Sequence, residues 1–274
     1  MPASWAEPIT KYLLKEINAG RPKTTVRLRR MHLAYAARSL RSAPTKITTD
    51  MLMDWMGRQD WKRETRRSYR SSLRGFFKFA CATGLIDHDP AADLPAIRME
   101  SPRPRPAPDD AWLRALQTPR ADVRLMLRLA GEAGLRRAEV SKVHVRDVLD
   151  GPQLYVHGKG SHDRIVPITD SLAGQLLLGA AGHTPGASDS GWLFPGECDS
   201  HLSPEWVGQL CAAALPGELT MHTLRHRFAT RAYRASRNIR AVQLLLGHQS
   251  IVTTQRYLAV DDDEVRAAMM GAVA

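Results

Sequence analysis

The sequence predicts a mainly α-helical protein of two domains, with a small antiparallel β-sheet in the second domain. Apolar residues recur at helical spacing through most of the chain, and three short segments near its middle are instead β-branched and separated by turn residues. A proline-rich stretch separates two halves with different patterns. The chain has 274 residues, 43% of them hydrophobic, which is enough to bury a core in each domain.

The domain boundary is predicted at a basic, proline-rich linker. Four prolines fall within the seven residues 102–108, where they remove backbone donors and favour an extended chain. We therefore expect a first domain at 1–98, a linker at 99–108 and a second domain at 109–274. The arginines of the linker can contact a DNA phosphate backbone, or they can simply keep the linker soluble, and the sequence favours neither role.

The first domain is predicted to be all-helical, with helices near 8–18, 23–40, 49–57 and 63–83. The last helix has an apolar stripe at Tyr69, Leu73, Phe76 and Ala80. A second stripe on that helix is basic, and Arg66 adds to it. Such a face can be merely solvated, but with little acid to balance it we expect contact with DNA phosphates by Arg63, Arg67, Arg70 and Arg74.

The charge balance favours a polyanionic partner. The net charge is +11, and residues 1–100 contribute +9 of it, from 19 Lys and Arg against 10 Asp and Glu. Nucleic acid is favoured over a membrane surface because no apolar run reaches membrane-spanning length. The three cysteines lack metal-ligand or disulfide-framework spacing, and the N-terminus lacks a signal-peptide pattern, so the cytoplasm is the expected compartment.

The second domain is predicted to combine helices with one small sheet. Strands are expected at Val143–Val148, Gln153–His157 and Arg164–Pro167, separated by Asp-Gly and Gly-Lys-Gly turns. Helices are expected near 109–116, 120–134, 169–180, 203–214, 221–235, 238–246, 250–258 and 262–271.

The first candidate functional residues of this domain are Arg136 and Lys159. Arg136 ends an apolar helix after Gly134, and Glu139 lies three residues further, where its carboxylate can orient a basic group. Taken alone, this pattern is more typical of a surface ion pair. Lys159 lies between two glycines, where a flexible turn lets a long ammonium side chain reach into a groove, although lysines in glycine turns are common on any surface.

A second group of candidates lies on one predicted helix. His222 and Arg225 are spaced i and i+3, so both can address one phosphate. His222 and His226 have a spacing that zinc sites also use, but Thr223 replaces the glutamate of a metalloprotease helix and no third ligand is evident. We therefore predict no metal, and expect His226 to pack or cap in the interior.

The last candidates are His248 and Tyr257. His248 follows Gly247, a typical helix C-cap, and Tyr257 lies nine residues further. Separately, they would be a capping histidine and a core tyrosine. As a nucleophile, a tyrosine with a pKa near 10 needs a base and neighbouring cations, which the histidines and arginines would supply.

Together these motifs resemble the tyrosine recombinase family, also called phage integrases. The resemblance covers roughly residues 109–270 and rests on the order and spacing of Gly134–Glu139, Gly158–Pro167, His222–His226, Leu245–His248 and Tyr257. The first half resembles the helical core-binding domain of the family, which implies a two-domain, C-shaped DNA clamp. His162 stands where a second lysine is frequent, and Arg227 where a smaller residue is common. A compact form without an arm-binding domain is expected.

The resemblance implies a role for each candidate residue. Tyr257 would be the nucleophile that forms a 3′-phosphotyrosine, and Arg136 and Arg225 would hold the phosphate. Lys159 would protonate the leaving oxygen, and His222 would accept the tyrosine proton. His248 would hydrogen-bond the phosphate, and Glu139 would support the arginines. The expected reaction needs neither metal nor cofactor.

The function predicted from the resemblance is site-specific recombination through a Holliday junction, which integrates or excises a phage or mobile element. The expected partners are double-stranded DNA core sites, three further copies of the chain in a homotetramer, and a directionality or host accessory factor, all at the bacterial nucleoid. A recombinase of the Xer type that resolves chromosome dimers is the nearest alternative. A type IB topoisomerase and a non-catalytic DNA-binding accessory protein are the others.

Overall fold

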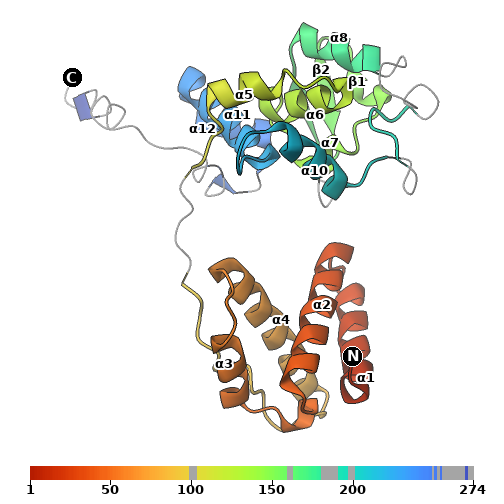
Figure 1. Ribbon diagram of the computed structural model, residues 1–274, viewed down its shortest axis with the longest axis vertical. Helices are drawn as coiled ribbons and strands as arrows, with labels where there is room; N and C mark the ends of the chain where they lie inside the picture. The colour runs from red at the N-terminus through yellow and green to blue at the C-terminus, as the bar shows by residue number, and fades with distance from the viewer. Residues whose placement is uncertain are drawn as a thin grey trace. The chain divides into compact units, whose positions relative to one another are not determined.

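The computed structural model describes residues 1–98, 104–158, 163–179, 191–196, 201–248, 250–251, 254 and 269–270. The chain forms two compact units, Met1–Glu100 and Ser101–Ala274 (Figure 1). Each unit has a hydrophobic core of its own.

The first unit is a small helical bundle. Its helices are α1 (Ala3–Asn18), α2 (Lys23–Leu40), α3 (Thr49–Gly57) and α4 (Arg63–Ala82), with a 3₁₀ turn at Pro44–Lys46. Helix α1 packs on both α2 and α4, and Trp5 stacks on Phe76 with ring centroids 5.4 Å apart. Helix α1 begins before its predicted start at residue 8 because Trp5 is also buried in the core.

The second unit is built around one helix. Its elements are α5 (Asp109–Ala115), α6 (Ala121–Glu132), α7 (Arg137–Val140), strands β1 (Val148–Leu149), β2 (Gln153–Val156) and β3 (Arg164–Pro167), and helices α8 (Asp170–Leu178), α10 (Pro204–Ala214), α11 (Met221–Ser236) and α12 (Ile239–Leu246). Seven of the twelve residues of α6 are buried, and three of its charged residues, Arg124, Arg128 and Glu132, are spaced four apart along one stripe. It contacts α5, α8, α10 and α11 (Figure 1).

The sheet is antiparallel, with strand order β1-β2-β3, and confirms the predicted fold class. Val156 pairs with Arg164 in the register of β2 and β3. The predicted strand Val143–Val148 is wrong for most of its length, because a 3₁₀ turn occupies Val145–Asp147. This turn forms because the buried Asp147 carboxylate accepts the backbone N–H of His144 at 2.9 Å and contacts the His157 ring at 3.0 Å.

Two glycines of the recognised motifs are required by the local geometry. Gly134 has φ +67°, and a Cβ there would lie 2.5 Å from the ring of Phe228. Gly247 has φ +61° and ends α12 in the left-handed conformation. At the other end of α12, the side chain of Asn238 accepts the N–H of Ala241 at 3.0 Å. Both ends of this helix are therefore fixed by local sequence.

Helices predicted near 250–258 and 262–271 fall mostly outside the described residues. Within the described part, Met269 and Met270 are exposed. Among all the residues that the structure describes, no helix is both long enough and apolar enough to span a membrane.

Candidate active site

Arg225 is a buried arginine at the start of α11. Its side chain is only 1% exposed. One terminal nitrogen donates to the carbonyl of Gly134, and the other donates to the carbonyl of Leu246 at 2.6 Å. The guanidinium therefore connects the loop after α6 to the end of α12, and its plane is fixed by protein atoms.

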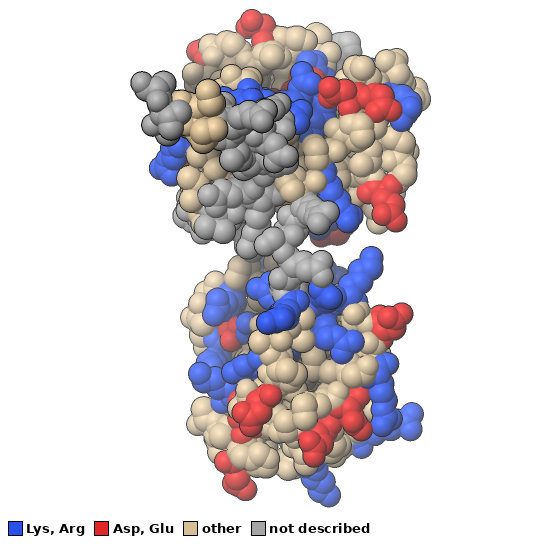
Figure 2. All heavy atoms as spheres, turned by 90° about the vertical axis from the view of Figure 1, so that its left-hand side faces the viewer, with Lys and Arg blue, Asp and Glu red and all other residues tan. Residues whose placement is uncertain are grey.

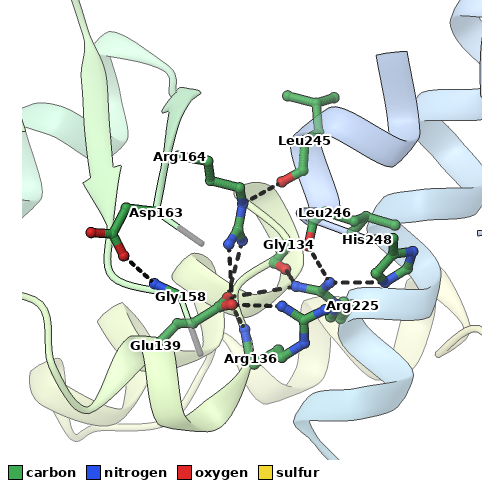
Figure 3. A network of polar contacts seen from close by, with 10 residues as sticks. All are labelled: Gly134, Arg136, Glu139, Gly158, Asp163, Arg164, Arg225, Leu245, Leu246 and His248. Carbon is green, nitrogen blue, oxygen red and sulfur yellow. Dashed lines mark hydrogen bonds and ion pairs between the residues drawn. The ribbon is translucent and has the colours of Figure 1, made fainter. Parts of the chain in front are cut away.

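Glu139 provides the negative charge of the site. Its buried carboxylate accepts hydrogen bonds from the backbone N–H of Arg136 at 2.8 Å and from the Arg136 guanidinium at 2.7 Å. Arg225 lies 3.6 Å away. Burial alone would raise the pKa of Glu139, but hydrogen bonds and charge from Arg164, with contributions from Arg136 and Arg225, outweigh burial and lower it. Glu139 is therefore an anion that orients arginines (Figure 3).

Arg136 is the more accessible of the two motif arginines, with 42% of its side chain exposed. Arg136, His222 and Arg225 line one cavity of about 690 Å³ between α7, α10 and α11. The positive end of α11 also lies at this cavity, because His222 and Arg225 belong to its first turns. Helix N-termini and arginine forks both suit phosphate oxygens.

His222 is a neutral base at physiological pH. Burial first, and then the charges of Arg225 and Arg136, lower its pKa. Its Nε2 lies 3.0 Å from Nε2 of His226, which has a pKa lowered to about 4 by burial and by its neighbours. His226 is buried in the interior, and His222 faces the cavity. In the described residues no group of three or more His, Cys, Asp and Glu side chains is placed to hold a metal.

His248 lies against Arg225, where its Nε2 is 3.1 Å from the guanidinium. Because arginine can only donate, this nitrogen accepts, and Nδ1 carries the proton and donates to the hydroxyl of Thr254 at 2.9 Å. Burial, and then the charges of Arg225, Arg136 and Arg164, lower the pKa of His248 to about 3. In this arrangement the ring orients Arg225, whereas the sequence predicts a direct bond to phosphate.

The sequence model of the phage integrase family matches residues 109–264, more than half of the chain. The chain belongs to the phage integrase family. Its recognition as a tyrosine recombinase is confirmed.

Curated relatives of this recombinase include Xer proteins. A tyrosine recombinase XerC of Vibrio vulnificus strain YJ016 is 33% identical over 74% of this chain and 68% of the relative. A tyrosine recombinase XerC of Shewanella amazonensis is 31% identical over 98% of this chain and 96% of the relative. The lambda integrase tetramer solved on a Holliday junction has a similar fold, with a TM-score of 0.74, 22% identity, and coverage of 92% of this chain and 76% of that chain.

These findings establish the activity class. The protein is a site-specific tyrosine recombinase, an enzyme that binds DNA and cleaves and rejoins its strands. The likeness to lambda integrase supports the fold.

Two of the predicted catalytic residues of this recombinase, Lys159 and Tyr257, lie outside the described residues. Their nearest described neighbours in the chain are close to the site. Lys159 directly follows Gly158, and Tyr257 lies three residues beyond Thr254, which bonds His248. The structure brings together the other predicted residues: Arg136, Glu139, Arg225 and His248 are in mutual contact (Figure 3), and His222 lines the same cavity as Arg136 and Arg225.

Sequence reasoning missed Arg164, which approaches Glu139 with both terminal nitrogens, at 3.1 and 3.0 Å. A signal was present in the sequence. Arg164 alternates with Val166 along a strand, so it shares the inner face with a buried residue. A charge on the inner face of a strand requires a partner of opposite charge, and Glu139 is that partner.

The basic stripe of α4 is divided between two uses. Arg70 donates to the carbonyl of Leu94 at 2.6 and 3.0 Å, and Arg66 donates to the carbonyls of Met56 and Gln59. These two arginines therefore hold the first unit together. Arg63, Arg67 and Arg74 are exposed, and Lys and Arg predominate over much of the face of this unit in Figure 2.

The lowered pKa of His222 predicts the pH dependence of cleavage. A protonated His222 ring has no free nitrogen to accept the tyrosine proton. Because the pKa of His222 is lowered from the ordinary 6.5, half of the rings are protonated only at a pH below 6.5. We expect the single-turnover rate of covalent-complex formation to fall on acidification, with a midpoint below pH 6.5. A midpoint at or above pH 6.5 would contradict either the lowered pKa of His222 or its predicted role as the proton acceptor.

Thermal unfolding measured over the same pH range separates this effect from loss of the fold. His226 and His248 have folded-state pKa values of about 4 and about 3, below the ordinary 6.5. The folded protein therefore binds fewer protons than the unfolded chain between these values. Their contribution to stability is present above pH 6.5 and is lost as the pH falls towards 4 and 3.

Proposed function

We propose that this recombinase cleaves one DNA strand by attack of Tyr257 on a phosphodiester held by Arg136 and Arg225. The tyrosine oxygen forms a bond to phosphorus while the bond from phosphorus to the 5′ oxygen breaks. His222 accepts the phenolic proton, and Lys159 gives a proton to the departing 5′ oxygen. The products are a 3′-phosphotyrosine and a free 5′-hydroxyl.

The observation that carries this proposal is the convergence of Arg136, His222 and Arg225 on one cavity, with Glu139 fixing the arginines from behind. Preorganised cations stabilise charge that develops on a five-coordinate phosphorus without reorganising during the reaction. A neutral His222 at the same cavity suits proton transfer from a phenol, whose pKa near 10 keeps it protonated at neutral pH. His248 would act on the phosphate through Arg225.

The phosphotyrosine ester conserves the energy of the broken bond, so a 5′-hydroxyl from another strand can reverse the attack without a nucleotide cofactor. Exchange of two strands in this way yields a Holliday junction. We propose that four copies of the chain carry out this exchange on two core sites, supported by the tetramer in which the similarly folded lambda integrase binds a Holliday junction. The exposed arginines of α4, Arg63, Arg67 and Arg74, would contact DNA phosphates in the first unit.

For the biological role we propose Xer-type recombination between two copies of one chromosomal site, acting at the nucleoid. This proposal is supported by the Shewanella relative, an XerC protein that aligns over nearly the whole of both chains. Integration or excision of a phage or mobile element is the second candidate, because membership of the phage integrase family is compatible with both roles.

The test is covalent capture on the DNA of the source organism. The protein is incubated with nicked genomic fragments, denatured, and the attached strand ends are sequenced. We expect capture at one or two short inverted-repeat sites. One chromosomal site that recombines with its own copy supports the Xer-type role, and a pair of unlike sites, one on a mobile element, supports an integrase. Scattered capture would indicate a topoisomerase, and no capture would contradict the proposed activity.

A further inference from the structure

Arg164 makes contacts that no role proposed so far explains. It begins β3, and its side chain is 9% exposed. Both terminal nitrogens contact the Glu139 carboxylate, and Nε donates to the carbonyl of Leu245 at 2.8 Å. All three nitrogens of the guanidinium are thus paired inside the protein, with Glu139 on α7 and with Leu245 at the end of α12 (Figure 3).

The shape of the side chain is also fitted to its surroundings. A Cβ added to Gly247 would lie 3.0 Å from Cδ of Arg164, so the arginine stem lies along the last turn of α12. Lysine would keep the charge at this position but could not contact two oxygens of Glu139 and the Leu245 carbonyl together. Arg164 therefore fixes the position of β3, beyond balancing the charge of Glu139.

Lys159 lies in the part of the sequence that connects β2 to β3, five residues before Arg164. Asp163, next to Arg164, accepts the backbone N–H of Gly158 at 2.9 Å and the hydroxyl of Tyr155 at 2.8 Å. These two bonds join the end of β2 to the start of β3 and so close the base of the β2–β3 connection, residues 157–163. Lys159 directly follows Gly158 in sequence. Anything that fixes Arg164 against Glu139 also fixes the base of the segment that carries the proposed acid.

We propose that Arg164 is a positioning residue for strand cleavage, which holds the base of the β2–β3 connection against Glu139 and α12 so that Lys159 delivers its proton to the departing 5′ oxygen. This inference rests on the proposed function, in which Lys159 is that acid. In this role Arg164 affects the cleavage rate through the position of Lys159.

The test replaces the departing 5′ oxygen of the scissile phosphodiester with sulfur. A thiol has a pKa of about 8.5, against about 15.7 for water, so a thiolate leaves without receiving a proton. Covalent-complex formation is measured in single turnover on the oxygen and sulfur forms of the captured core site. We expect Arg164→Lys to slow cleavage of the oxygen form by about 100-fold, the lower range for a general acid, and to cleave the sulfur form within about 10-fold of the wild type.

The matched control is Arg128→Lys. Arg128 is also largely buried and makes a bidentate pair, with both Glu132 oxygens at 2.7 Å, but it lies on α6 and does not line the cavity of Arg136, His222 and Arg225. We expect it to cleave both substrates at the wild-type rate. Arg164→Gln keeps a neutral hydrogen-bond donor near Glu139. It replaces Arg164→Lys in both assays if that variant unfolds at the assay temperature.

Lys159→Ala separates the two ways the inference can fail. If sulfur rescues Lys159→Ala but neither Arg164 variant, Arg164 acts through the arginines or the fold, and this inference is overturned while the proposed function stands. If sulfur fails to rescue Lys159→Ala, the assignment of Lys159 as the acid fails, and the inference fails with it.

Discussion

Tyr257→Phe is expected to abolish covalent capture of DNA, with a loss of at least about 10⁴-fold, and to leave DNA binding unchanged. The substitution removes one oxygen atom and keeps the ring, so the packing of the side chain changes little. The phenol oxygen is the proposed nucleophile, and the arginines and His222 cannot supply another. Capture is measured on a nicked core site after denaturation, and binding by gel shift on the same DNA.

Tyr233→Phe is the matched control for this experiment. Tyr233 lies on α11 in the same unit, partly buried against Ala229, Val242 and Leu246. Removing its hydroxyl tests whether loss of any phenol oxygen lowers capture. Full capture by Tyr233→Phe together with persistent capture by Tyr257→Phe would show that the nucleophile lies elsewhere.

Arg225→Lys is expected to slow cleavage on the order of 10³-fold while weakening DNA binding only slightly. Loss of one preorganised donor costs about 10²–10³-fold in comparable sites, and lysine also loses the bidentate geometry. The change has a cost to the fold as well, because the carbonyls of Gly134 and Leu246 lose a buried donor. Such a loss costs about 1–3 kcal/mol for each unsatisfied group.

Arg227→Lys controls for that cost to stability. Arg227 lies two residues away on α11 and is largely buried, but it pairs with Asp109 at 2.7 Å and lies over the Trp112 ring. We expect it to lower the unfolding temperature and to leave the cleavage rate, measured well below that temperature, near the wild-type value. An equal loss of cleavage in both variants would show that Arg225 matters for folding alone.

Local signals in the sequence predicted the secondary structure well. Helices 23–40 and 49–57 are observed with the predicted bounds, and the strand Arg164–Pro167 is also confirmed. The error at Val143–Val148 arose because the buried carboxylate of Asp147 accepts the backbone N–H of His144 and so stabilises a 3₁₀ turn in place of a strand. The Asp147 carboxylate also contacts the ring of His157, which lies ten residues further along the chain, so the local sequence alone does not reveal the turn.

Five of the residues predicted for the candidate site, Arg136, Glu139, His222, Arg225 and His248, lie together in the structure, and their geometry was predicted only in part. The spacing of His222 and Arg225 correctly placed both at one cavity, because a helix fixes their separation. The sequence could not reveal that Arg164 shares Glu139, since this contact joins β3 to α7 through the tertiary fold. Similarly, nothing in the sequence distinguishes Arg66, which binds backbone carbonyls, from the exposed Arg67. The roles of Lys159 and Tyr257 remain predictions.

The end of α12 imposes a constraint of a different kind. Two successive carbonyls there, of Leu245 and Leu246, receive Arg164 and Arg225, and the left-handed Gly247 follows at once. Inserting or deleting one residue between Asn238 and Gly247 would rotate the helix end by about 100° and turn both carbonyls away from their guanidiniums. By contrast, the exposed side chain of Leu244 can change freely. For this helix, length matters more than composition: exposed residues can be substituted, but residues cannot be inserted or deleted.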